Sequence, residues 1–474
     1  MSRRFLPARR RFLAAAGVGA YAARMPALAA CPPPSPPSEG EVLRAPMELP
    51  VRRPEPGLVE ATLRAAPLST RIAGQPADLL SYGGSYPGAL LRLNSGDTLR
   101  LRFENRLAQP SNLHFHGLAG APSCNADNIW VVTPPGAAFD HELPLLPQEA
   151  GLFWIHPHAH GQTARPLFAG LAAPLLVQGA IDLDSELAQA DDRVLVLKDL
   201  TLENCAPAPR APHDWIFGKE GDWLLVNGQR RPQLQALRSM LRLRVVNASN
   251  ARYWKLALDS GEPLHLIALD GRFLERRVEV SELLLVPAAR AEFLVDLSTG
   301  GPRRLMYLPS PRRALQHTPA QPLLDITPPP QQAPVRLPGA LTPVARFPLD
   351  AVDREREVRL SAMLINGKPF RHHHQGMHVA PQFVAAAGSR EIWTVINDDV
   401  MDHPFHLHTW HFEILSVSGR PPPSRQVRDM INLRPGDVAR LGIEFDRYTG
   451  RTMFHCHIAE HADMGMMAVL EVRN

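Results

Sequence analysis

Apolar and polar residues alternate with a period of two in three widely separated segments of the chain. The segments are 98–105, 240–247 and 391–397, and each of them ends at an asparagine. Alternation of this kind indicates a β-strand with one face buried and the other toward solvent. Because the three closing asparagines follow one another at nearly equal intervals, the pattern indicates an internal repeat of one all-β unit.

The repeat predicts how the chain divides. Smaller features recur in the same order, such as Asn227-Gly228 before the second strand and Asn366-Gly367 before the third. Many short strands separated by Pro- and Gly-rich turns are typical of β-sandwiches. We therefore predict an all-β protein. Its three domains are expected over residues 45–180, 181–330 and 335–474, preceded by a Pro-rich linker over 31–44.

The composition supports this fold class and reduces the number of possible functions. The chain has 474 residues, of which 48 are proline, 20 histidine and 4 cysteine. Proline breaks helix interiors, so its abundance argues against a helical protein. The formal net charge is only +4, with both signs interspersed, which gives no support for a nucleic-acid partner. Four cysteines are too few for a disulfide scaffold, whereas so many histidines direct the search toward metal sites.

The first thirty residues are predicted to be an export signal. A basic stretch is followed by an apolar run over 12–23, which is too short to span a bilayer. The run Arg9-Arg10-Arg11-Phe12-Leu13 resembles a twin-arginine signal and predicts export to the periplasm. Two processing sites compete: cleavage after Ala27-Leu28-Ala29, or a lipobox that would make Cys31 a lipid anchor. No later apolar run is long enough for a transmembrane segment.

Eight of the histidines form four His-x-His pairs. Positions i and i+2 of a strand point to the same side, so each pair projects two imidazoles in one direction. Imidazole suits Cu, Zn, Fe and Ni, and eight imidazoles exceed what one ion holds. Two pairs lie in each of the first and third predicted domains, so we predict a multinuclear cluster between those domains. The pairs are His114-Phe115-His116, His156-Pro157-His158, His406-Leu407-His408 and His455-Cys456-His457.

The middle domain has no such pair, and it carries Arg252-Tyr253-Trp254 after its repeat strand. Cys456, inside the last pair of the third domain, identifies the metal. His403 precedes the third pair, while His461 and Met466 follow Cys456 closely. Two His, one Cys and a weak axial Met form the ligand set of a blue-copper electron-transfer site. Because Cys456 is bonded through the chain to a histidine on each side, an electron at that copper has a short path to the cluster.

Together these motifs resemble those of the multicopper oxidases, in the three-domain bacterial branch of laccase-like enzymes and cuprous oxidases. The resemblance covers nearly the whole chain after the signal, and it rests on residues 113–118, 154–161, 403–408 and 455–467. It implies three cupredoxin-like Greek-key β-sandwich domains. It also implies four copper ions: one type 1, one type 2 and a type 3 pair.

The resemblance further implies which residues hold each copper. Type 1 copper takes His403, Cys456, His461 and axial Met466, and type 2 copper takes His114 and His406. One type 3 copper takes His116, His156 and His457, and the other takes His158, His408 and His455. The division within the type 3 pair is less firmly implied than membership of the cluster.

The implied reaction couples four one-electron oxidations at type 1 copper to the reduction of O2 to two waters at the trinuclear cluster. Cleavage of the O–O bond needs protons, which carboxylates commonly relay. Asp127 resembles an outer-sphere Asp of the family, with a solvated loop Asp as the alternative. Many bacterial relatives carry Glu where this chain has Ala462, so Asp463, Glu460 or water would take over that relay. The candidate catalytic residues are therefore Cys456, Asp127 and Asp463.

The electron donor stays open between phenols, aromatic amines and metal ions such as Cu(I). The His-rich run 371–378 is a candidate copper-capturing loop, with a solvated polar loop as the alternative. Cys124 and Cys205 are a candidate disulfide between the first two domains. Competing hypotheses are periplasmic copper storage with little turnover and a copper-free relative that acts in envelope assembly. The complete ligand set speaks against both, and we expect a monomeric enzyme that uses O2 and a small reducing substrate.

Overall fold

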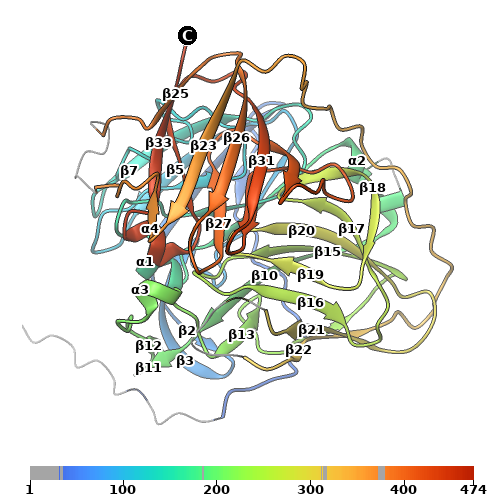
Figure 1. Cartoon of the computed structure of the whole chain (residues 1–474). Helices are drawn as coiled ribbons and strands as arrows, with labels where there is room; N and C mark the ends of the chain where they lie inside the picture. The colour runs from blue at the N-terminus through green and yellow to red at the C-terminus, as the bar shows by residue number, and fades with distance from the viewer. Residues whose placement is uncertain (1–30, 32–35, 184–185, 311, 313–317, 372–378) are drawn as a thin grey trace, which may run out of the picture. The chain divides into compact units, whose positions relative to one another are not determined.

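The structure is a computed structural model that describes residues 31, 36–183, 186–310, 312, 318–371 and 379–474. The predicted export signal and nearly all of the His-rich run 371–378 lie outside the described residues. The chain divides into two compact units, residues 1–33 and 34–474. All of the strands and helices described here belong to the second unit (Figure 1).

Strands dominate the described residues, which confirms the predicted all-β fold class. The strands form seven sheets, and the helices are single turns at the connections. The helices are α1 (Ala164–Phe168), α2 (Ala180–Leu183), α3 (Asp214–Phe217), α4 (Ala459–Asp463) and a 3-10 turn over Glu186–Gln189. Among the described residues, no helix has the length and apolar character that crossing a membrane requires.

Two sheets form the first part of the unit. One contains β1 (Val51–Arg52), β2 (Leu58–Ile72), β3 (Gln75–Tyr82), β5 (Thr98–Asn105) and β7 (Ala138–Pro144). The other contains β4 (Leu91–Asn94), β9 (Ala173–Gln178), β8 (Gly151–His156) and β6 (His114–His116), in that spatial order. The apolar faces of the two sheets share one hydrophobic core.

The middle part repeats the two-sheet plan. Its larger sheet has the order β13 (Trp223–Val226), β10 (Asp191–Leu200), β15 (Met240–Asn247), β20 (Arg290–Asp296), β17 (Leu264–Leu269) and β18 (Arg272–Val280). Its smaller sheet has the order β14 (Gln233–Gln235), β22 (Gln321–Thr327), β21 (Arg303–Leu308), β16 (Trp254–Leu258) and β19 (Leu283–Leu285). A short hairpin of β11 (Leu202–Glu203) and β12 (Ala206–Pro207) lies apart from both sheets.

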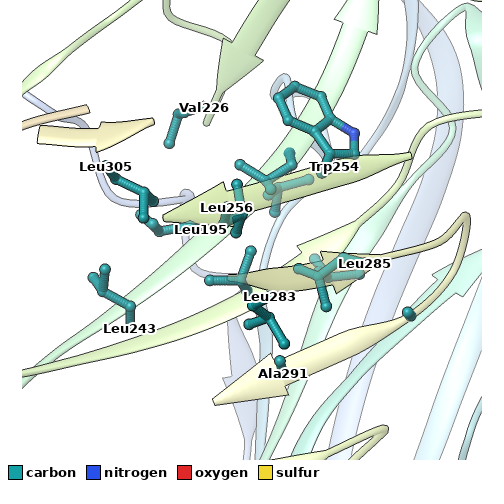
Figure 2. Packing of buried hydrophobic residues seen from close by; sticks show 14 of the residues in the cluster. Leu195, Val226, Leu243, Trp254, Leu256, Leu283, Leu285, Ala291 and Leu305 are labelled. Carbon is teal, nitrogen blue, oxygen red and sulfur yellow. The ribbon is translucent and has the colours of Figure 1, made fainter. Parts of the chain in front are cut away.

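The core of the middle part lies between its two sheets. Figure 2 shows side chains from both sheets directed toward one another, with the indole of Trp254 at one end of the cluster. Removing these apolar side chains from water is the main stabilising contribution, at roughly 25 cal/mol per Å² buried. The labelled members are Leu195, Val226, Leu243, Trp254, Leu256, Leu283, Leu285, Ala291 and Leu305.

The third part has the same plan again. Its larger sheet has the order β24 (Leu364–Ile365), β23 (Arg354–Ser361), β26 (Arg390–Asn397), β31 (Val438–Glu444), β28 (Phe412–Val417) and β29 (Val427–Arg428). Its smaller sheet has the order β25 (Phe383–Ala386), β33 (Met467–Arg473), β32 (Gly450–Cys456), β27 (His403–Leu407) and β30 (Met430–Leu433). In Figure 1 the orange and red arrows of β23, β26 and β31 lie side by side, as their pairing requires.

The strands that end in asparagine occupy equivalent places in the three parts. β5, β15 and β26 each pair in parallel with an earlier strand and antiparallel with a later one. Asn105, Asn247 and Asn397 are fully buried, and each side-chain amide donates to two backbone carbonyl groups. Each side-chain oxygen also accepts from the N–H two residues later. Asparagine closes the strand because it offers two donors and an acceptor, and aspartate lacks the donors.

The three predicted repeat strands are thereby confirmed. Segments 98–105 and 240–247 have the bounds of β5 and β15, and segment 391–397 begins one residue earlier, at Arg390. The boundaries of the three domains stay a prediction.

Candidate metal centre

The four His-x-His pairs lie in or at the ends of two pairs of antiparallel strands, with His158, His408 and His457 just beyond the strand ends. β6 pairs with the end of β8, which sets His114 opposite His156, and β27 pairs with β32, which sets His406 opposite His455. All eight imidazoles are at most 3% exposed. The rings of the two strand pairs meet, because His114 and His408 stack with their centroids 4.0 Å apart. The structure thus brings the histidines of the first and third parts into one buried cluster.

Four of these imidazoles are held by a hydrogen bond from Nδ1. A carbonyl or carboxylate oxygen only accepts, so each Nδ1 carries the proton and the lone pair stays on Nε2. Such bonds fix the ring orientation and leave Nε2 as the metal-binding atom. The bonds run from His156 to the Pro157 carbonyl (2.9 Å), from His455 to the Cys456 carbonyl (2.8 Å), from His406 to the Asp429 carbonyl (2.9 Å) and from His114 to the Asp127 carboxylate (3.0 Å).

Several ring nitrogens inside the cluster have no hydrogen-bond partner among the described residues. They include Nε2 of His114 and His406, and both ring nitrogens of His457. A buried polar atom without a partner costs about 1–3 kcal/mol. Because several such lone pairs share one small space, the donor set fits bound metal ions, which would supply the interaction that the protein alone does not.

Burial keeps these imidazoles neutral. Desolvation lowers the pKa of His156 and His406 to about 3 and the pKa of His455 to about 4. Neutral imidazole is the form that binds a metal, so protons do not compete with the metal at physiological pH.

The donor atoms fall into overlapping triads, within each of which they lie within 4.8 Å of one another. His158, His408 and His455 form one triad, with His455 Nε2 3.3 Å from His158 Nε2 and 3.0 Å from His408 Nε2. These three residues are the set that sequence analysis predicted for one type 3 copper. The other all-histidine triads are His114, His406, His408 and His114, His116, His156.

The remaining member of the cluster, His457, lies beside His116 and His156, the two other residues of its predicted type 3 set. The centroid of its ring is 4.9 Å from that of His116 and 5.2 Å from that of His156. The structure therefore groups the predicted ligands, while their division between type 2 and type 3 copper stays a prediction.

A second, separate group of donor atoms surrounds Cys456. Nδ1 of His403 and Nδ1 of His461 each lie 3.5 Å from Cys456 Sγ, and all three side chains are fully buried. Met466 is equally buried, and its carbonyl accepts from the N–H of Cys456. Burial raises the pKa of the Cys456 thiol to about 12, so a nearby cation is needed to favour the thiolate at neutral pH. Two imidazoles and a thiol around one point fit the predicted type 1 copper.

Comparison with known proteins agrees with this geometry. A family profile described as multicopper oxidase matches residues 346–474, and a second profile with the same description matches residues 66–180. The chain belongs to the multicopper oxidase family. This confirms the family that the sequence motifs predicted.

Individual relatives extend over most of this multicopper oxidase. It is 29% identical to multicopper oxidase mco of Staphylococcus aureus, over 88% of this chain and 89% of that protein. It is 30% identical to cell division protein FtsP of Dickeya dadantii, over 98% of each chain. A solved structure of a multicopper oxidase from Campylobacter jejuni, described as a metallo-oxidase, is similar with a TM-score of 0.84 and 29% identity, covering 92% of this chain and 96% of that one.

Asp127 contacts the histidine cluster of this multicopper oxidase directly. Its two carboxylate oxygens lie 3.0 and 3.1 Å from His114 Nδ1, and one of them accepts from the N–H of Phe115 (3.0 Å). The residue is 3% exposed, so the alternative of a solvated loop Asp is wrong. Burial raises the pKa of Asp127 to about 7 in spite of the Phe115 N–H.

Asp463 and Glu460, the other relay candidates, make their hydrogen bonds elsewhere. The carboxylate oxygens of Asp463 accept from the N–H groups of Thr163 and Ala164 at the start of α1, both at 2.9 Å. Glu460 accepts from the side-chain amide of Asn250 (2.9 Å). No hydrogen bond of either carboxylate within the described ranges reaches a cluster histidine, and both instead join separate parts of the chain.

The outer edge of the predicted type 1 site is closed by α3. His461 Nε2 donates to the carbonyl of Ile216 (2.8 Å), and His461 has no exposed surface. Ile216 is 51% exposed and Trp215 is 36% exposed, so these two residues face the solvent in place of the imidazole. The sequence does not predict this cover, because α3 belongs to the middle part and no motif links it to His461.

Asp429 and Arg290 also lie beside the cluster, although no sequence motif predicts them. The carboxylate of Asp429 lies 3.4 Å from His116 Nε2, and the Asp429 backbone carbonyl holds His406. Arg290 forms a bidentate ion pair with that carboxylate, at 2.9 and 2.5 Å. Nothing in the local sequence around either residue marks it as part of a metal centre.

The predicted disulfide between Cys124 and Cys205 is wrong. Cys124 is free and exposed, whereas Cys205 is disulfide-bonded. Cys205 lies in the turn between β11 and β12, and Cys124 lies in the loop after β6. A disulfide needs Cα atoms within about 7 Å of each other, and spacing along the chain does not reveal that proximity. Cys31 is disulfide-bonded as well, and one sulfur cannot be in a disulfide and a lipid thioether at once.

Proposed function

We propose that this multicopper oxidase is an exported enzyme that couples four one-electron oxidations of a reducing substrate to the reduction of O2 to two waters. The observation that supports it is the arrangement of donor atoms in two separate groups. His403, Cys456 and His461 form one group, and eight buried imidazoles form the other. Bound copper would supply one-electron redox chemistry at the first group and O2 reduction at the second.

One strand serves both groups. Side chains alternate along β32, so Cys456 points to the side opposite from His455. Cys456 therefore faces His403 and His461, while His455 faces His158 and His408. The polypeptide bonds between neighbouring residues are the route that we propose for electrons between the two sites.

The cluster and the residues around it have two further functions in this proposal, the exclusion of water and the delivery of protons. The rings themselves are buried, which excludes bulk water from the reacting oxygen. We propose that Asp127 holds His114 through its Nδ1 proton and lies on the route by which protons enter. Asp463 holds the start of α1 through two backbone N–H groups, and its part in proton relay stays a prediction.

We infer that the electron donor is small, and that a metal ion such as Cu(I) is a better substrate than a bulky phenol. The Ile216 carbonyl and α3 keep a donor from touching His461. Asp399 lies next to the other imidazole, with Oδ2 3.2 Å from His403 Nε2, and its pKa is lowered to about 2. A carboxylate that is ionised at neutral pH attracts a cation and disfavours an anionic phenolate.

The experiment is to load the protein with copper, record its visible spectrum and measure O2 uptake with Cu(I) and with a bulky phenol. We expect an intense blue band, O2 uptake with one O2 consumed per four electrons, and a higher kcat/KM for Cu(I). The matched control is Cys456→Ser, which keeps the size of the side chain and removes the soft ligand. Absence of the blue band contradicts the type 1 site, and a blue protein without O2 uptake supports copper storage.

A role in cell division is the second candidate, because the likeness to cell division protein FtsP extends over 98% of each chain. A role in cell division that does not depend on the predicted type 1 site is a distinct hypothesis. It predicts that a strain carrying Cys456→Ser divides normally while a strain lacking the protein does not. The oxidase proposal predicts that Cys456→Ser and the deletion have the same phenotype.

A further inference from the structure

Arg290 is the first residue of β20, in the part of the chain that supplies no predicted copper ligand, yet its guanidinium lies beside the histidine cluster. It is fully buried, and its two Nη atoms donate to the two carboxylate oxygens of Asp429. Asp429 joins β29 to β30 in the third part and is 1% exposed. A bidentate pair of this kind fixes both distance and orientation, which a point charge does not.

The same guanidinium also contacts the first part of the chain. Nε of Arg290 lies 3.4 Å from the carbonyl of Leu152 on β8, the strand that ends in His156. A side chain at Gly117, next to His116, would overlap the guanidinium and the Asp429 carboxylate. Gly117 has a φ of +89°, which favours glycine for a second reason. The chain therefore leaves room for Arg290 directly behind a predicted ligand.

Asp429 connects this arginine to the imidazoles. Its backbone carbonyl accepts from His406 Nδ1 (2.9 Å), and its Oδ1 lies 3.4 Å from His116 Nε2. Both carboxylate oxygens accept from Arg290, and Asp429 lies on the Nε2 side of His116, whose other ring nitrogen, Nδ1, lies 3.4 Å from His156 Nε2. A residue that fixes the far side of a ligand sets its orientation and affinity for the metal.

The charges in this buried group are balanced. Asp270 lies 3.6 Å from Arg290 and 2.6 Å from Arg428, and it also accepts from the backbone N–H of Arg290. Two arginines and two aspartates thus compensate one another away from water, which is the condition under which buried ions are tolerated. The group joins the middle and third parts of the chain, and Arg290 also contacts the Leu152 carbonyl of the first part.

We propose that Arg290 is a positioning residue for the histidine cluster: through Asp429 it fixes His406 and His116, and so determines how tightly the copper held by His114 and His406 is bound. This inference rests on the proposed function, because it concerns the copper sites assigned there. It gives the middle part a direct role in the metal centre, although that part contributes no ligand.

The test is Arg290→Gln, with Arg242→Gln as the matched control. Arg242 is equally buried in the same sheet and is paired with Asp182 and Glu292, away from the histidines. The measurements are copper content per chain, the type 2 signal in electron paramagnetic resonance during titration with a chelator, the blue absorbance and thermal unfolding. We expect Arg290→Gln to keep the blue band and to lose about 10–100-fold in type 2 copper affinity, as is typical for residues behind metal ligands.

We expect the control to lower thermal stability without changing the type 2 affinity. Wild-type affinity in Arg290→Gln, or an equal loss in Arg242→Gln, overturns the proposal. If Arg290→Gln does not fold, Arg290→Lys serves as the second variant, because it keeps the charge but does not span both oxygens of Asp429. We expect Arg290→Lys to weaken the type 2 copper affinity as well. An unchanged affinity in Arg290→Lys also overturns the proposal. A wild-type protein with neither a blue band nor a type 2 signal contradicts the proposed function itself, and that outcome is distinct from either result.

Discussion

The middle and third parts of the chain share one strand plan and differ in the side chains placed on it. After its repeat strand the third part carries His403 and His406 on β27, and both face metal groups. At the corresponding place the middle part carries Arg252-Tyr253-Trp254. Trp254 enters the hydrophobic core and its indole N–H donates to Ser249 (3.0 Å). The scaffold does not fix the chemistry, which follows from the side chains at a few positions.

The difference does not make the middle part a passive spacer. Tyr253 donates to the side chain of Asn432 (2.9 Å), which lies on β30 of the third part. Arg290 holds Asp429 behind the cluster, and Ile216 covers His461. The third part thus supplies predicted ligands, while the middle part supplies residues that contact or cover them.

Cys456→Ser should have the largest effect, because it removes the predicted soft ligand of the type 1 site. We expect the blue absorbance to disappear and O2 uptake to fall to background. Folding should be retained, since serine fits the same space. Visible spectroscopy and an oxygen electrode measure both effects, and a blue Cys456→Ser protein would show that this residue is not the type 1 ligand.

Comparing His158→Ala with His265→Ala tests whether only the histidines of the cluster matter for function, and not a histidine of the middle part. His158 belongs to the cluster, whereas His265 lies on β17 of the middle part beside Arg277 (2.7 Å). We expect His158→Ala to lose copper and nearly all O2 uptake while the blue band persists. His265→Ala should keep both. Metal analysis and O2 uptake measure both effects. Equal losses of copper and O2 uptake in the two variants would contradict a function specific to the cluster.

Trp254→Ala should act on stability rather than on chemistry. Truncating a fully buried tryptophan costs about 3–5 kcal/mol of unfolding free energy. We expect a lower urea midpoint, with an unchanged ratio of blue absorbance to folded protein. A selective loss of the blue band in the folded fraction would mean that the core of the middle part affects the predicted type 1 site. The middle and third parts would then differ less in function than we expect.

Asp127→Ala should have the smallest effect of the four, because it removes a support of a ligand and not a ligand. We expect a loss of about 10–100-fold in type 2 copper affinity or in O2 uptake. Asp140→Ala is the matched control, since Asp140 is an exposed carboxylate on neighbouring β7 paired with Arg102. Chelator titration and O2 uptake measure the change, and equal behaviour of the two variants would argue against a role for Asp127 in the cluster.

Much of the fold and most of the candidate metal site were open to prediction from local patterns. Strand alternation located β5 and β15 at their observed bounds, and the His-x-His pairs meet in one cluster although only His114 and His116 both lie within a strand. The contacts that the sequence did not predict correctly all involve segments that are far apart along the chain. The Asp463 carboxylate holds α1 some 300 residues earlier, and Cys124 does not meet Cys205.

By itself, the sequence determined the all-β class and the family and predicted the donor residues, because each of these depends on residue types and their spacing along the chain. Only the tertiary structure decided that His158 meets His408 and His455, that Ile216 covers His461 and that Arg290 braces Asp429. A period of two tells which side of a strand a residue faces. It carries no information about which other strand packs against that side, and that choice is made by burial and charge compensation across the whole folded unit.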